Sequence, residues 1–116
     1  MFVNNIYVVG DFLLVDIGVK NKTNLQYDID EIRFKLMDKK HVGAHISQEI
    51  ELKPLYQFYK YDTPISGKWR NFYLFRKFTY PGEKVFNVEL TEKQISGRRI
   101  DLNINYNQLL HAQFLL

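Results

Sequence analysis

The stretch EIRFKL, residues 31–36, alternates charged and apolar side chains without interruption. In an extended chain, successive side chains point to opposite faces, so the apolar and charged residues separate completely. The apolar residues are Ile32, Phe34 and Leu36, and the charged residues are Glu31, Arg33 and Lys35. A period of two is typical of a β-strand with one buried and one solvent-exposed face. The stretch therefore predicts a half-buried strand.

The same alternation recurs in four further segments of the chain, residues 13–19, 46–52, 86–90 and 100–106. Turn signals separate these segments: Gly10-Asp11 as a hairpin connection, Pro81-Gly82 as a type II turn, and Ser96-Gly97 before the last predicted strand. Many short strands with regular turns predict an all-β fold, an immunoglobulin-like antiparallel β-sandwich. Residues 106–116 are compatible with a short C-terminal helix or with a closing strand.

Length and composition indicate one ordered domain over residues 1–116. The chain has 116 residues, of which 46% are hydrophobic, enough for a single core. The formal net charge of +3 is far from the excess expected of a dedicated nucleic-acid-binding protein. The absence of cysteine excludes disulfides, a thiol nucleophile and thiolate metal sites.

No pattern in the sequence indicates catalysis or a cofactor. The serines lack a nucleophile-elbow context, and the six glycines are scattered instead of forming a phosphate-binding loop. His41 and His45 have no third metal ligand nearby, and the carboxylates of residues 28–31 lack the glycine turn of a calcium loop. We therefore expect no enzyme, no metal, no cofactor and no small-molecule substrate. The longest apolar runs are too short for a transmembrane segment, and residues 1–9 lack the features of a secretory signal.

The stretch KWRNFYLFRKF, residues 68–78, is aromatic on both of its predicted strand faces. Trp69, Tyr73 and Phe75 share one face, whereas Phe72 and Leu74 share the other with Phe78. A half-buried strand needs only one apolar face. The second face is therefore expected to be covered either by the aromatic residues 55–61 or by a partner.

Aromatic residues mixed with cations are typical of protein interfaces and also of single-stranded nucleic-acid sites. The mild net charge favours a protein partner. We therefore predict Trp69, Tyr73 and Phe75 as interface anchors. The cations beside them are Arg70, Arg76 and Lys77. The alternatives are a single-stranded nucleic-acid-binding β domain and a carbohydrate- or cell-wall-binding sandwich.

Several longer blocks of the sequence resemble the TraN proteins of conjugative transposons. The blocks are LLVDIGVKNKTNLQYD (13–28), YDIDEIRFKLMDKK (27–40), QEIELKPLYQF (48–58), FRKFTYPGEKVFNVEL (75–90) and GRRIDLNINYNQLLHA (97–112). They occur in the same order as in that family, and the resemblance covers roughly residues 12–115.

The resemblance implies a non-catalytic, structural component of a conjugative DNA-transfer apparatus of the type IV secretion kind. It implies similarity to the VirB-type subunit of the outer-membrane core complex of Gram-negative bacteria. The matched part looks like the C-terminal domain of a longer protein, located in the periplasm or at the inner face of the outer membrane. The implied partners are other transfer proteins, including a small outer-membrane lipoprotein, channel subunits and further copies of the same protein.

Overall fold

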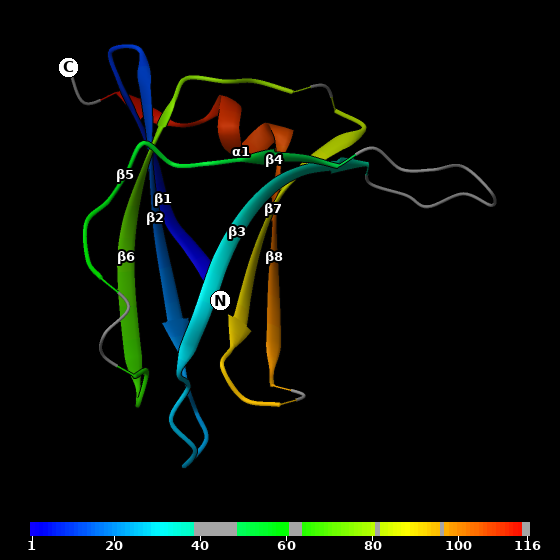
Figure 1. Ribbon diagram of the computed structural model, residues 1–116. Helices are drawn as coiled ribbons and strands as arrows, with labels where there is room; N and C mark the ends of the chain where they lie inside the picture. Colours follow the sequence, from blue (N-terminus) through cyan, green and yellow to red (C-terminus); the bar gives the residue numbers. More distant parts are fainter. Residues whose placement is uncertain (39–48, 61–63, 81, 96, 115–116) are drawn as a thin grey trace, which may run out of the picture.

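The computed structural model describes residues 1–38, 49–60, 64–80, 82–95 and 97–114, which form two β-sheets and one short helix (Figure 1). One sheet has five strands in the order β5-β6-β2-β1-β9, and the other has four in the order β4-β3-β7-β8. The strands of the first sheet are β5 (Tyr56–Gln57), β6 (Lys68–Arg76), β2 (Phe12–Lys20), β1 (Phe2–Val9) and β9 (Gln113–Phe114). Those of the second are β4 (Ile50–Leu52), β3 (Ile29–Asp38), β7 (Lys84–Glu92) and β8 (Arg99–Asn105).

The strand order is that of an immunoglobulin-like sandwich, as the sequence predicted. Strands β1, β2, β6 and β5 correspond to the A-B-E-D sheet, and β3, β7 and β8 correspond to C-F-G with β4 as C′. Neighbouring strands run antiparallel, except that β9 pairs with β1 in parallel. The prediction of an all-β sandwich is therefore confirmed.

The core lies between the two sheets and is centred on Phe34 of β3. The Phe34 ring centroid lies 4.9 Å from that of Tyr73 and 4.9 Å from that of Phe75, both on β6 of the opposite sheet. Phe86 of β7 packs against the same group. On β2, the predicted inward face is buried throughout: Leu13, Val15, Ile17 and Val19. Edge-to-face ring contacts at these separations add to the hydrophobic stabilisation of the core.

The C-terminal part contains both structures that the sequence left open. The helix α1 (Tyr106–Leu110) follows β8 directly, and β9 then pairs with β1. Leu109 of α1 is 7% exposed and belongs to the core, so the helix closes one end of the sandwich (Figure 1). At its start, the side chain of Gln108 accepts a hydrogen bond of 2.9 Å from the backbone N–H of Asn105, which satisfies a donor that a helix start leaves free.

The predicted hairpin connection at Gly10-Asp11 is confirmed. Val9 and Phe12 are paired across it, and Gly10 has φ +59°, a conformation that favours glycine. Pro81, Ser96 and the first part of the predicted strand 46–52 lie outside the described residues. Within the described part of the chain, no helix is long and apolar enough to cross a membrane.

Candidate functional site

The outer face of the five-stranded sheet carries the alternate residues of β6 that do not enter the core. Their cross-strand partners in β2 define a continuous surface: Leu74 lies opposite Leu14, Phe72 opposite Asp16, and Arg70 opposite Gly18. On the other side of β6, Tyr56 pairs with Leu74. We call this surface the aromatic face. Its apolar members are Phe2, Tyr7, Phe12, Leu14, Tyr56, Phe58, Phe72 and Leu74.

Two of the three predicted anchors are in the core instead. Tyr73 is 0% exposed and Phe75 is 2% exposed, because the odd-numbered residues of β6 point toward the opposite sheet. The prediction that these two residues contact a partner is therefore wrong. Trp69 is only half-buried at the end of the same strand face, so its role as an anchor stays a prediction.

The predicted cations and Phe78 occupy different positions. Arg70 and Arg76 are exposed on the aromatic face. Lys77 is exposed just beyond β6, where its backbone N–H donates to Asp11 in the β1–β2 connection. Phe78 was expected on the face of Phe72, but the strand ends at Arg76 and the Phe78 ring packs 5.0 Å from Phe86 in the core.

The described part of the aromatic segment 55–61 does not cover the face of β6. It runs beside β6 as the edge strand β5. The Phe58 ring lies 5.4 Å from Tyr56 and 5.4 Å from Phe72, so the three rings form a row across the two strands. Tyr56 remains 59% exposed and Phe58 48% exposed. The segment therefore extends the aromatic face and leaves it open to solvent.

A buried amide fixes the position of this edge segment. Asn71 on β6 is 0% exposed. Its Oδ1 accepts a hydrogen bond of 3.0 Å from the backbone N–H of Tyr59, and its Nδ2 donates to the Tyr59 carbonyl at 3.0 Å. Both polar atoms of the side chain are therefore satisfied by the edge segment, as a buried amide requires. These bonds hold the residue that follows Phe58.

An ion pair crosses the middle of the aromatic face. Asp16 on β2 is 0% exposed, and the guanidinium of Arg70 donates to both of its carboxylate oxygens, with an Nε–Oδ1 distance of 2.8 Å. The amide of Asn4 donates to the same carboxylate at 3.1 Å. The hydrogen bond to Asp16 raises the pKa of Arg70. The same guanidinium lies 5.0 Å from the centroid of the Phe72 ring, within the range of a cation–π interaction.

Next to this ion pair, the surface forms a hollow of about 400 Å³. It is lined by Phe2, Asn4, Gly18, Val19, Lys20, Lys68, Trp69 and Arg70. The ring of Phe2 lies directly over Gly18, because a Cβ at position 18 would come within 2.7 Å of that ring. Gly18 thus allows an aromatic ring to pack closely against the sheet and form one wall of the hollow.

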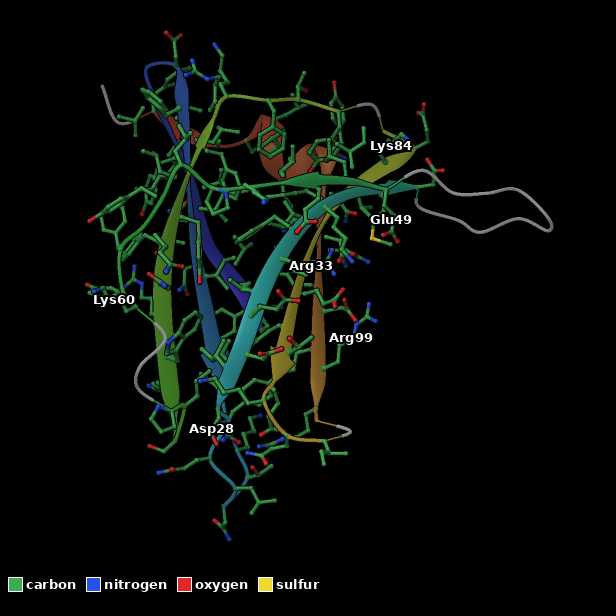
Figure 2. The ribbon with its side chains drawn as sticks, viewed as in Figure 1. Asp28, Arg33, Glu49, Lys60, Lys84 and Arg99 are labelled. Carbon is green, nitrogen blue, oxygen red and sulfur yellow. The ribbon has the colours of Figure 1, made fainter. Side chains whose placement is uncertain are left out.

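The outer face of the four-stranded sheet, which we call the polar face, is different in character. Four of its ion pairs share residues and form a chain: Lys35–Glu49, Lys35–Glu89, Arg99–Glu89 and Arg99–Asp101. A fifth pair, Arg33–Glu51, is separate. Hydrogen bonds with Arg33 hold the pKa of Glu51 below its ordinary value. Figure 2 shows Arg33, Glu49 and Arg99 on the side of β3, β7 and β8, with Lys60 on the opposite side beside β6.

The polar face also has a shallow hollow of about 430 Å³ over β7 and β8. Asn87 lines it, and its Nδ2 donates to Asn103 at 2.9 Å, while its buried Oδ1 has no hydrogen-bond partner among the described residues. His41 and His45 lie outside the described residues. Among the residues that the structure describes, no three His, Asp or Glu side chains gather as they would around a metal ion.

The family model described as "Domain of unknown function (DUF4138)" matches residues 1–114. The chain belongs to this family. Comparison of the DUF4138 chain with curated proteins and with solved structures finds no match. The match spans both sheets of the DUF4138 domain, so the aromatic face lies entirely within the family's boundaries.

Sequence reasoning selected Arg70 and Arg76 of the aromatic face of the DUF4138 domain but missed its apolar residues. Phe72 and Leu74 were placed correctly on a shared face, but that face was not selected as the interface. Asp16 and Phe2 were not considered, since their neighbours belong to other strands. The available signal was the pairing of LLVDIGV (13–19) with WRNFYLF (69–75), which puts a carboxylate next to an arginine and leaves aromatic residues outside.

Proposed function

We propose that the DUF4138 domain is a non-catalytic docking domain of a conjugative DNA-transfer apparatus, and that its aromatic face binds another protein of that apparatus. The observation that carries the proposal is the exposure of Phe2, Tyr56 and Phe58 on a sheet face whose other aromatic members, such as Phe72, are only half-buried. Contiguous exposed apolar surface with aromatic residues and arginine is typical of protein interaction sites.

The rest of the surface supports the choice of this face. The polar face has its charges paired with one another, and burying those pairs against a partner would remove them from water at a cost. The aromatic face instead gains hydrophobic stabilisation when a partner covers it. Of the two sheet faces, the aromatic one therefore offers the better docking surface.

The conjugative setting of the proposal comes from the resemblance of residues 12–115 to TraN proteins. On that basis, the domain acts in the periplasm or at the inner face of the outer membrane. Its partners there are other transfer proteins: a small outer-membrane lipoprotein, channel subunits, or further copies of the same protein. The step from resemblance to setting is an analogy between systems.

Site-specific photocrosslinking in cells that carry the transfer element tests this proposal. A photoreactive phenylalanine analogue replaces Phe58, which is exposed and aromatic, in the full-length protein. The matched control carries the same analogue at Glu31, an exposed position on the outer side of β3. We expect a discrete crosslinked product with another transfer protein, identified by mass spectrometry, from position 58 and not from position 31.

Two results would contradict the proposal. One is the absence of any product from position 58 when the variant is folded and expressed. The other is the same set of products from both positions, which would indicate random encounters.

A further inference from the structure

The hollow beside the Asp16–Arg70 ion pair contains two lysines that face each other. Lys20 at the end of β2 and Lys68 at the start of β6 are directly opposite in the antiparallel register. Like charges in this arrangement destabilise a sheet. Neither lysine forms an ion pair with a described residue, although Arg70 close by is fully paired with Asp16. Among the described residues that line the hollow, no carboxylate balances the two lysines.

The imbalance extends over the whole five-stranded sheet. Its strands carry four cations and one carboxylate, a net charge of +3, and that carboxylate, Asp16, is buried beneath Arg70. The strands of the four-stranded sheet carry four cations and seven carboxylates, a net charge of −3. The two outer faces are therefore opposite in charge. An acidic partner is electrostatically complementary to the aromatic face and is repelled by the polar face.

The walls of the hollow add an apolar requirement. Phe2 packs closely against Gly18 on one side, and Trp69 lines the hollow at the start of β6. Beyond the hollow, the apolar surface continues along the aromatic face through Phe72 and Leu74. An occupant that fits must bring negative charge to the two ammonium groups and apolar side chains to the aromatic row. A polypeptide segment in which acidic and apolar residues are mixed has both properties.

The aromatic face is less well suited to a nucleic-acid strand. Base stacking needs free ring faces. The Phe72 ring is already in contact with the Arg70 guanidinium and the Phe58 ring. Leu14 and Leu74, directly opposite each other in the middle of the face, offer aliphatic contact instead of stacking.

We propose that the hollow formed by Phe2, Gly18, Lys20, Lys68 and Trp69 binds a carboxylate side chain of an acidic, apolar segment of the docking partner. The inference rests on the proposed function, since it specifies the chemistry of the partner that the aromatic face binds. Lys20 and Lys68 hold the carboxylate, and Phe2 contacts the apolar part of the same segment.

Fluorescence anisotropy with the purified chain tests this assignment. The probe is a labelled peptide in which glutamate alternates with leucine, and the comparison probes are the same peptide with lysine in place of glutamate and a labelled oligothymidylate. The variant Lys20→Glu/Lys68→Glu reverses the charge of the hollow. The control Lys53→Glu/Lys93→Glu makes the same change in net charge at exposed lysines that do not line the hollow. Thermal melting verifies that both variants are folded.

We expect the unsubstituted chain to bind the acidic peptide and Lys20→Glu/Lys68→Glu to weaken this binding by about tenfold or more, as measured for close charge pairs at interfaces. The control is expected to change it by less than about threefold, because distant exposed charges are screened. The lysine–leucine peptide is expected to bind the charge-reversed variant better than the unsubstituted chain.

An equal loss of affinity for the acidic peptide in Lys20→Glu/Lys68→Glu and in Lys53→Glu/Lys93→Glu would overturn the assignment, since binding would then depend on net charge alone. Binding of oligothymidylate without binding of the acidic peptide would overturn it in favour of a nucleic-acid strand. If position 58 crosslinks to a transfer protein but the acidic peptide does not bind, docking stands and the carboxylate site fails. If the peptide binds in the hollow but position 58 gives no crosslink, the proposed function fails and the carboxylate site stands.

Discussion

The two sheets of the sandwich have similar inner faces and opposite outer faces. Inside, both contribute large apolar side chains to one core, such as Phe34 from β3 and Tyr73 from β6. Outside, the four-stranded sheet presents a network of ion pairs, whereas the five-stranded sheet presents a row of rings with few charges. The inner faces account for the fold, and the difference between the outer faces needs another explanation.

The two outer faces differ in how far contacts within this chain satisfy their side chains. On the polar face, Lys35 and Arg99 each have carboxylate partners. On the aromatic face, Tyr56 and Phe58 are about half-exposed. Folding of the chain alone thus satisfies one outer face and leaves the other with uncovered apolar surface.

The test with the largest expected effect makes a phenylalanine-to-alanine substitution in the core and on the aromatic face. Phe34→Ala removes a ring that is 1% exposed and contacts three other aromatic rings, and we expect the free energy of unfolding to fall by about 3–5 kcal/mol. Phe72→Ala removes a half-buried ring from the aromatic face, and we expect a loss of about 1 kcal/mol. Urea denaturation of both variants measures the two values.

A comparable loss from both substitutions would break the distinction. Phe72 would then be part of the core in energetic terms, and its position on the outer face would need no partner to explain it. A small loss for Phe72→Ala leaves the ring available for a role in binding.

The second test compares one arginine on each outer face. Arg70→Ala leaves the carboxylate of Asp16 buried without its main partner, and an unpaired buried charge is strongly destabilising. Arg33→Ala breaks the pair with Glu51, whose side chain is 42% exposed and can return to water. We expect Arg70→Ala to lower Tm by about 4 °C or more, and Arg33→Ala to change it much less.

A double variant identifies the cause of that loss. Arg70→Ala/Asp16→Asn removes the unpaired charge, so its Tm should lie above that of Arg70→Ala. No recovery in the double variant would mean that Arg70 stabilises the sheet through its contact with the Phe72 ring instead.

Much of the fold could be predicted from the sequence because strand alternation is a local property. Residues 31–36 define their own inner and outer sides, and the structure places Phe34 in the core and Arg33 outside. The same holds for residues 13–19, where Leu13, Val15, Ile17 and Val19 are buried. The Gly10-Asp11 hairpin is equally local, since the turn depends on a glycine with φ +59°.

The candidate site could not be predicted in the same way because β6 is aromatic on both faces. Tyr73 and Phe75 were assigned to the interface, and both are in the core. The choice between the faces depends on the register of β6 with β2, which joins Val15 to Tyr73 across a long stretch of sequence. No short stretch of the sequence indicates that register. The buried face of β6 therefore could not be distinguished from its exposed face.

The edge segment illustrates a second limit. Residues 55–61 could have folded over β6 or beside it, and their aromatic composition fits both arrangements. Two hydrogen bonds between the Asn71 side chain and the backbone of Tyr59 favour the position beside β6. The buried amide of Asn71 therefore helps to place Phe58 on the aromatic face. That Asn71 binds the Tyr59 backbone can be seen only in the folded structure.

The smallest expected effect concerns Glu92, which ends β7 in the four-stranded sheet. Its side chain is 7% exposed, and hydrogen bonds from the guanidinium and backbone N–H of Arg98 lower its pKa from 4.5 to about 2. In the unfolded chain the carboxyl takes up a proton near its ordinary pKa, whereas in the folded chain it stays ionised. The stabilisation is therefore complete above about pH 4.5 and is lost as the pH falls toward 2.

Glu92→Gln removes the titrating group, so the unfolding free energy of this variant should depend less on pH between about 4.5 and 2 than that of the unsubstituted chain. Arg98→Ala should likewise reduce the pH dependence of the unfolding free energy in this range, because it removes the guanidinium donors that keep the Glu92 carboxylate ionised. Denaturation curves recorded across that range measure both. Curves that stay parallel to those of the unsubstituted chain would show that the pair of Glu92 and Arg98 makes no contribution to acid sensitivity.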